Sequence, residues 1–170
     1  METVKELKNA GIAKGLCRQW QMKLKSGLNI ADLSRLYIKG IDFCISENFP
    51  TLDYFRDHFK GQCEPYGIYV DDEVSGLNNV PDIVLNGDCK ANLDYYGYSV
   101  SRIYTRHKSI VTVNISDHAI LTIDAFDDSR IIVNSSGKYS KVFVNLYGKS
   151  QVESTTGGLI KVTFKNKITY

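Results

Sequence analysis

A short phrase recurs about every ten residues between Ser109 and Val162, and it limits what this chain can fold into more than any other feature. Each copy is a small residue, any residue, an apolar residue, any residue, and usually a second apolar residue. The copies are Ser109–Val113, Ala119–Ile123, Ser129–Val133, Ser140–Val144, Ser150–Ser154 and Gly158–Val162, with weaker copies from Cys89 and Ser99. Alternating apolar positions predict short strands that each bury one face.

Polar residues also keep the phase of the repeat. Asn114, Asp124, Asn134 and Asn145 each follow the second apolar residue of a copy. Stacked copies would bring such side chains into ladders. Two ten-residue runs make a flat coil of roughly twenty residues, and eight runs make about four coils. The repeat therefore predicts a β-solenoid domain over residues 89–170. The same spacing also fits an antiparallel β-sandwich, which is the alternative.

The N-terminal residues 1–61 have helical rather than strand-like spacing. We expect one helix to about Lys25, a second from about Asn29 to Glu47, and a third from Pro50 to Gly61. These would form a small helical docking or capping module. Residues 62–88 are predicted to be a linker with two short extended pieces, Ile68–Val70 and Ile83–Leu85. The expected fold class is therefore α+β.

Composition restricts the partners and the location. The net charge is +2 with 24% charged residues, so no global field favours nucleic acid or an anionic membrane. No run is long and apolar enough to span a membrane, and the N-terminus lacks the apolar core of a signal peptide. The four cysteines are widely scattered, which favours reduced thiols. We expect a protein that is made and kept in a cytosol.

A cluster of tyrosines and arginines is the best candidate binding surface. Its members are Tyr95, Tyr96, Tyr98, Tyr104, Arg102 and Arg106. Tyrosine is frequent in this chain, with eleven residues, and tyrosines on one surface suit a binding patch. Basic residues among aromatic ones are also typical of nucleic-acid binding. Nucleic acid is nevertheless not expected as a partner, because acidic residues balance the basic ones through the repeat.

No combination of residues predicts catalysis, a metal or a cofactor. Asp71-Asp72-Glu73 lacks the alternating spacing of a calcium loop, and His58 and Cys63 lack the paired ligands of a zinc site. His107 and His118 are expected to form a surface pair across a coil, with no nucleophile or oxyanion loop beside them. We therefore expect no catalytic residue, no metal ligand, no cofactor and no enzymatic activity.

Three phrases, Tyr37–Cys44, Pro50–Phe55 and Cys63–Asp72, are followed by the repeat. In this arrangement the chain resembles uncharacterised accessory proteins of phages and prophages of gut Bacteroidales. The resemblance covers most of the chain and implies a phage-encoded accessory protein, such as a virion fibre or decoration protein. It would be made in the host cytoplasm and then enter the virion. No functional residue is carried over from the resemblance.

The leading hypothesis is a non-enzymatic structural or interaction protein. It would form a homo-oligomer, with a trimer favoured, and bind other phage or host proteins. One alternative is an intracellular phage effector that binds and inhibits a host protein. Another is a glycan- or ligand-binding module, in which Tyr95, Tyr96 and Tyr98 should line a groove rather than a core.

Overall fold

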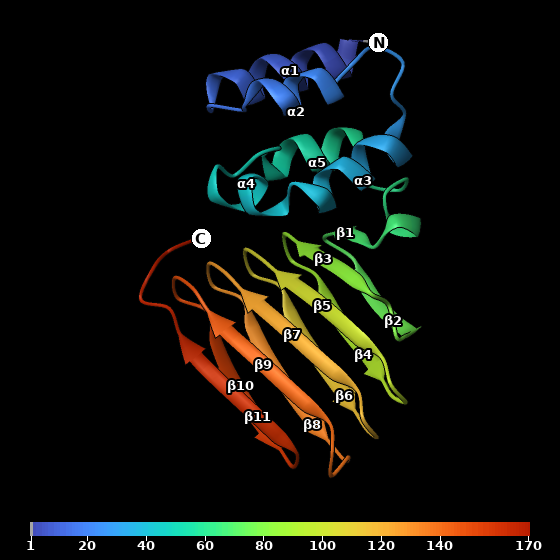
Figure 1. Cartoon of the computed structure of the whole chain (residues 1–170), viewed down its shortest axis with the longest axis vertical. Coiled ribbons are helices and arrows are strands. Elements are labelled where there is room, and N and C mark those ends of the chain that lie inside the picture. Colours follow the sequence, from blue (N-terminus) through green and yellow to red (C-terminus); the bar gives the residue numbers. More distant parts are fainter. Residues whose placement is uncertain (1) are drawn as a thin grey trace. The chain divides into compact units, whose positions relative to one another are not determined.

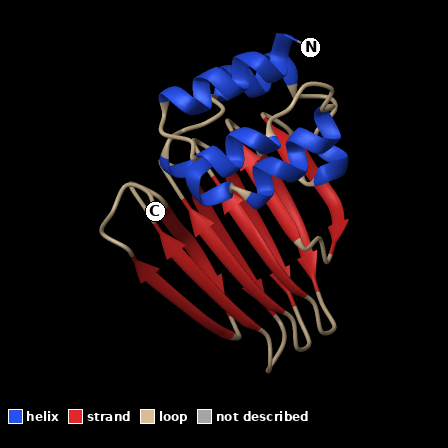
Figure 2. Ribbon diagram, turned by 45° about the horizontal axis from the view of Figure 1, so that its top comes forward, coloured by secondary structure: helices blue, strands red, loops and turns tan. Residues whose placement is uncertain are grey.

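The computed structural model describes residues 2–170, apart from the side chains of Glu2 and Thr3. A helical N-terminal region is followed by a parallel β-solenoid of about five turns (Figure 1, Figure 2). The α+β class and this order of parts are as predicted. All neighbouring strands in the described sheets pair in parallel, so the antiparallel sandwich is excluded.

Five helices lie in the described part of the N-terminal region. They are α1 (Glu2–Ala13), α2 (Arg18–Lys23), α3 (Ile30–Lys39), α4 (Ile41–Ser46) and α5 (Leu52–His58). Two helices that were expected to be continuous are each broken at a glycine. Gly15 has a φ of 87°, which ends α1, and Gly40 leaves the helical conformation between α3 and α4. A Cβ at Gly40 would lie 3.2 Å from the Trp20 ring, so this glycine also allows the indole to approach.

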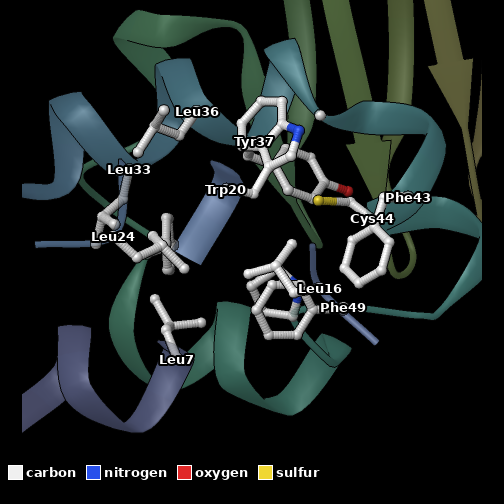
Figure 3. A pocket seen from close by; sticks show the side chains of 13 residues that line it. Leu7, Leu16, Trp20, Leu24, Leu33, Leu36, Tyr37, Phe43, Cys44 and Phe49 are labelled. Carbon is white, nitrogen blue, oxygen red and sulfur yellow. The ribbon is translucent and has the colours of Figure 1, made fainter. Parts of the chain in front are cut away.

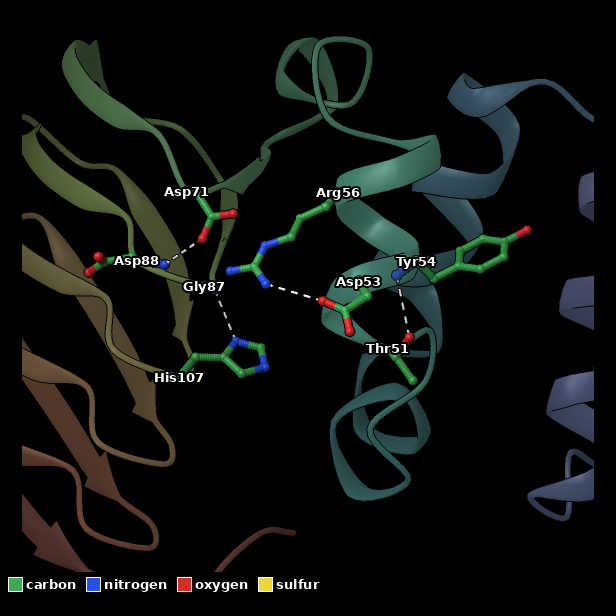
Figure 4. A network of polar contacts seen from close by, with 8 residues as sticks. All are labelled: Thr51, Asp53, Tyr54, Arg56, Asp71, Gly87, Asp88 and His107. Carbon is green, nitrogen blue, oxygen red and sulfur yellow. Dashed lines mark hydrogen bonds and ion pairs between the residues drawn. The ribbon is translucent and has the colours of Figure 1, made fainter.

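The helical unit has caps and a core of its own. The Asn29 side chain accepts a hydrogen bond from the Asp32 amide at 2.9 Å, and Asp32 Oδ2 accepts one from the Asn29 amide. Thr51 caps α5 by accepting from the Tyr54 amide, as Figure 4 shows. Phe55 is 1% exposed and contacts Tyr37 edge to face, with ring centroids 4.9 Å apart. Aromatic packing therefore holds α3 and α5 together.

Eleven strands form two sheets in the described chain. The strands are β1 (Ile68–Val70), β2 (Glu73–Asn78), β3 (Asp82–Asn86), β4 (Lys90–Tyr95), β5 (Val100–Thr105), β6 (Ile110–Ile115), β7 (Ile120–Ala125), β8 (Arg130–Ser135), β9 (Lys141–Leu146), β10 (Gln151–Thr156) and β11 (Leu159–Phe164). Sheet A has the order β1-β3-β5-β7-β9-β11, and sheet B has the order β10-β8-β6-β4-β2. Successive strands thus alternate between the sheets, and each coil contributes one strand to each.

The register shows why the repeat has this period. Val111 pairs with Ile131 twenty positions later, and Leu121 pairs with Val142 twenty-one positions later. The longer step reflects the turn at residues 136–140, which has one residue more than the turn at 116–119. Inward apolar residues from both sheets meet between them, and Val113, Ile123 and Val133 are completely buried. Stacked coils therefore bury a core that a single coil could not bury alone.

The small residue that starts a phrase lies buried at a corner between strands in most copies; Ser99 is partly buried, and Gly158 of the last copy is exposed. Ser109, Ser129 and Ser150 donate hydrogen bonds to carbonyl oxygens of the preceding coil, those of Gly87, Thr105 and Ala125 respectively. Ala119 occupies the matching corner on the other side and is also fully buried. Burial leaves little room for a larger side chain, and each buried hydroxyl finds an acceptor in a carbonyl oxygen that also accepts a backbone amide. This explains the small residue at the start of the copies whose corner is buried.

The segment 62–88 is largely part of the solenoid rather than a linker. Both predicted extended pieces are strands, β1 and β3, and β2 lies between them. The chain divides into a unit up to Tyr66 and a unit Gly67–Thr169. The repeat was missed in this segment because β2 departs from it: its register shifts between Val74 and Leu77, where Gly76 has a φ of 73°. The solenoid therefore has about five turns rather than the four expected.

Replacing Val133 with Asp should unfold the solenoid. Val133 is completely buried between the sheets, and an unpaired carboxylate there should lower the free energy of unfolding by about 3 kcal/mol or more. Ile132→Asp is the matched control, because Ile132 is the next residue of β8 and points away from the core. Thermal unfolding followed by circular dichroism compares the two. Equal melting of Val133→Asp and the parent chain would contradict the assignment of Val133 to the core.

Candidate functional site

The six residues expected to form one binding surface are divided between interior and surface. Exposed fractions are 2% for Tyr95, 4% for Tyr104 and 4% for Arg106, against 46% for Tyr96 and 83% for Tyr98, and the Arg102 side chain is 60% exposed. Tyr95 is inward because it shares the face of Leu93 in β4. An exposed patch can therefore include Tyr96, Tyr98 and Arg102, but not the other three residues.

The two arginines of the cluster have structural partners. Arg102 Nε lies 3.1 Å from Asp82 Oδ1, so the pair links β5 to the neighbouring β3. This pair is largely exposed and contributes little to stability. The Arg106 amide donates to the Leu85 carbonyl oxygen, which continues the β3–β5 ladder into the turn.

Tyr95 has an unusual environment for a tyrosine. Its hydroxyl is buried and has no hydrogen-bond partner among the described residues. Burial raises the pKa of this phenol well above its ordinary value, and the Asp82 carboxylate adds to the effect. Tyr95 therefore acts as a core residue that carries the cost of an unsatisfied hydroxyl.

Three exposed rings form a stack along the turns that lead from sheet B to sheet A. Tyr98 and His118 have ring centroids 4.8 Å apart at an angle of 15°, and His118 and Tyr139 have centroids 5.0 Å apart at 10°. We call this set the tyrosine–histidine stack. Each ring comes from a successive coil, so the spacing matches that of neighbouring strands. His118 lies twenty residues after Tyr98 and twenty-one before Tyr139, which is the interval of one coil, so the stack has a signal in the sequence that the expected pairing of His118 with His107 overlooked.

His107 and His118 do not form the expected pair, because they lie in opposite lines of turns. Residues about ten apart belong to opposite ends of one coil, and only residues about twenty apart are stacked. His107 instead has a φ of 59°, and its Nδ1 accepts a hydrogen bond from the Gly87 amide at 3.0 Å (Figure 4). Its own amide donates to Asp127 Oδ2 in the next coil. His107 is thus a turn residue that links three coils.

Asp71 has the same kind of role. It has a φ of 51°, and its Oδ1 accepts from the Asp88 amide at 2.9 Å, as Figure 4 shows. Asp72 Oδ2 accepts from the Val70 amide at 2.8 Å. On the opposite line of turns, Asp117 accepts from the Gly97 amide. Aspartate, asparagine and histidine tolerate the left-handed region, and their side chains here complete the hydrogen bonding of a neighbouring turn.

The polar residues after each phrase form ladders, as the repeat predicted. Asn114 Nδ2 donates to Asp94 at 2.9 Å, and Asn134 Nδ2 donates to Asn114 at 3.1 Å, all on the outer face of sheet B. On sheet A, Asn145 Nδ2 donates to Asp124 Oδ1 at 2.6 Å. Because alternate copies belong to different sheets, the chain has two ladders where the sequence had indicated one series.

A groove of about 480 Å³ lies beside the ladder on sheet B. We call it the asparagine groove; its lining comes from the ends of the sheet B strands and the turns that follow them. The lining residues are Asn78, Asp94, Tyr95, Tyr96, Asn114, Ile115, Ser116, Asn134, Ser135, Ser136 and Thr156. Tyr95 and Tyr96 therefore line a groove, while Tyr95 also belongs to the core. Tyr98 lies in the same turn as Tyr96 but is not part of the lining.

The coil formed by β10 and β11 differs from those before it. Phe164 is 70% exposed although it pairs with Leu146, whose side chain is in the core. Ile160 and Val162, at the other inward positions of β11, are only partly buried. Inward apolar side chains of this coil therefore remain in contact with solvent.

The helical unit contains a small apolar cavity of about 50 Å³. Figure 3 shows that its lining side chains, among them Leu16, Trp20 and Phe49, come from several helices and the loops between them. A cavity of this size, with a lining that is almost entirely apolar, is typical of a packing gap in a helical core.

Comparisons with known proteins supply no relative. No protein family, no curated protein and no solved structure matches the chain. Among the residues that the structure describes, no group of three or more histidine, cysteine, aspartate and glutamate side chains is placed to hold a metal ion. None of the described helices has the length and hydropathy needed to cross a bilayer.

Tyr95→Phe should make the solenoid more resistant to alkali. The folded state holds the phenolic proton more tightly than the unfolded state, so stability falls as the pH rises above about 10, the pKa of an unfolded tyrosine. Phenylalanine removes this loss, and at neutral pH it also removes an unsatisfied hydroxyl at little cost in packing. The measurement is the denaturation midpoint of each chain at neutral pH and at about pH 11.

The matched control for this prediction is Tyr96→Phe, because Tyr96 is adjacent and exposed. We expect no change in alkaline stability from that substitution. A large loss of stability in Tyr95→Phe at neutral pH would show that the hydroxyl has a partner in the folded protein.

Proposed function

We propose that this protein is a non-enzymatic interaction protein whose solenoid associates with a second copy through β11. The observation that carries the proposal is the exposure of Phe164 at an inward register position. Exposed apolar side chains at the end of a solenoid are normally covered by a cap or a partner. A second copy supplies a surface of the same chemistry and length.

The hydrogen-bonding edge of β11 supports this arrangement. The amides of Leu159 and Lys165 donate to the preceding strand, so residues of odd number face β9. The amides and carbonyls of Ile160, Val162 and Phe164 therefore face the open edge. The same residues are the inward apolar ones, and both properties favour strand addition at this edge.

Several antiparallel pairings of β11 with itself place inward residues opposite inward residues, and we propose the one centred on Val162. Opposite residues must share a face, and centring the pair on Val162 places Phe164 opposite Ile160 of the second copy. The inward apolar side chains of β11 from the two copies then form one cluster. Lys161 lies opposite Thr163 of the second copy, so no two lysines of this strand face each other directly. The contact is isologous, and it closes with two copies rather than the trimer expected from the sequence.

Phe164→Glu should convert the protein into a monomer. Two glutamates would have to be buried beside apolar side chains, which opposes association. Light scattering coupled to size exclusion should give twice the 19.2 kDa of the chain for the parent protein and one chain mass for the variant. Phe143→Glu is the control, because Phe143 is 39% exposed on the outer face of β9, and it should remain a dimer. A monomeric parent protein would refute the proposal.

We extend the proposal to a virion accessory role on the basis of the sequence resemblance to phage proteins. A self-associating rigid solenoid suits a fibre or decoration protein. If this role is correct, mass spectrometry of purified phage particles should detect peptides of the chain in stoichiometric amounts. Its absence from particles, with abundance in infected cells, would instead favour the alternative of an effector that binds a host protein.

A further inference from the structure

We propose that the asparagine groove binds a linear, uncharged oligosaccharide. The proposal rests on the lining of the groove and is independent of self-association through β11. It assigns a ligand class to a surface that is separate from the open edge of the last coil, apart from Thr156 of β10 at its end.

The groove presents two parallel rows of hydrogen-bonding side chains. One row contains Asp94, Asn114 and Asn134, and the other contains Tyr96, Ser116 and Ser136. Each row takes one residue from each successive coil, so its groups repeat at the strand spacing of about 4.8 Å. From β2 to β10 the floor spans four such spacings, or about 19 Å. A periodic row of this length fits a short linear polymer with repeating polar groups.

The ladder leaves hydrogen-bonding capacity for a ligand. An asparagine side chain can donate two hydrogen bonds and accept two. Asn134 donates one to Asn114 and accepts one from Thr156, which leaves one donor and one acceptor. Asn114 Nδ2 uses both of its N–H groups, in hydrogen bonds to Asn92 Oδ1 and Asp94 Oδ1. The ladder thus fixes the amides in place while adjacent donors and acceptors remain for hydroxyl groups, which both donate and accept.

The charge of the groove lining favours an uncharged saccharide over a nucleic acid as the ligand. The lining contains no lysine or arginine, and its one ionisable side chain outside tyrosine is Asp94. A polynucleotide carries a phosphate on every residue and needs cations along its path. A neutral polyhydroxy chain needs none, and a carboxylate is a good acceptor for its hydroxyls. The groove therefore favours a saccharide over RNA or single-stranded DNA.

Two exposed tyrosines lie in the turn that follows β4, and one of them, Tyr96, lines the groove. Tyr96 is 46% exposed and lines the groove, and Tyr98 is 83% exposed at the end of the tyrosine–histidine stack. An aromatic ring offers an apolar face together with a polar hydroxyl, which suits a sugar ring with its C–H face and its hydroxyl rim.

Affinity electrophoresis tests the proposal with the full chain. Native gels contain one soluble neutral polysaccharide each: dextran, mannan, galactomannan, xylan or hydroxyethyl cellulose. We expect at least one to retard the protein, and we expect Tyr96→Ala and Asn134→Ala to weaken that binding about tenfold or more. Asn145→Ala is the matched control, since it removes the equivalent amide from the ladder on sheet A and should leave binding unchanged.

Three outcomes would overturn the proposal. These are no retardation by any of the five polysaccharides, equal weakening by Asn134→Ala and Asn145→Ala, and binding of a single-stranded RNA oligonucleotide that Asn134→Ala abolishes. The Phe164→Glu chain is included in the same gels. Retention of saccharide binding by this chain is expected whether or not the parent protein dimerises, so the two proposals fail or succeed separately.

Discussion

Coil-to-coil register is the constraint on which the rest of the solenoid depends. In the middle coils each strand meets, twenty or twenty-one residues later, a parallel strand with the same inward residues, and steps of sixteen to eighteen residues keep the same faces together in the first and last coils. A slip of one residue would turn every side chain to the other face. Once that register holds, the residues at all remaining positions of a coil also lie above the matching residues of the preceding coil. The buried corner serines, the turn aspartates and the asparagine ladders all follow from it.

Those stacked positions explain how much could be predicted from the sequence. The repeat after Ser109 identified the fold, the core and the polar ladders, since each copy keeps the same residue type at the same place. The first coils were missed because β2 is irregular around Gly76 and its copy of the phrase is degenerate. The helical breaks were missed because helical spacing continues across Gly15 and Gly40, and only backbone conformation and packing against Trp20 show the interruption.

The tyrosine cluster shows a second reason why the sequence-based prediction of a binding surface was incomplete. Grouping Tyr95, Tyr96 and Tyr98 by their closeness in sequence ignored the alternation of the strand, which was available from Ala91 and Leu93 and places Tyr95 inside. The tyrosine–histidine stack has the opposite character: Tyr98, His118 and Tyr139 are far apart in sequence and adjacent in space. A solenoid surface has to be sought at intervals of a whole coil, and the asparagine groove follows the same rule.

The two edges of the last coil are unlike, and the difference bears on function. β10 carries a bulge at Glu153, and that side chain pairs with Arg130 at 3.2 Å, so the strand is irregular and charged at its edge. Bulges and charges of this kind are how natural proteins prevent strand addition. β11 is regular throughout and ends in the exposed Phe164. The edge formed by β10 is therefore protected against strand addition, whereas the edge formed by β11 has only Lys161 at its centre. This asymmetry is expected if β11, and not β10, is used for association.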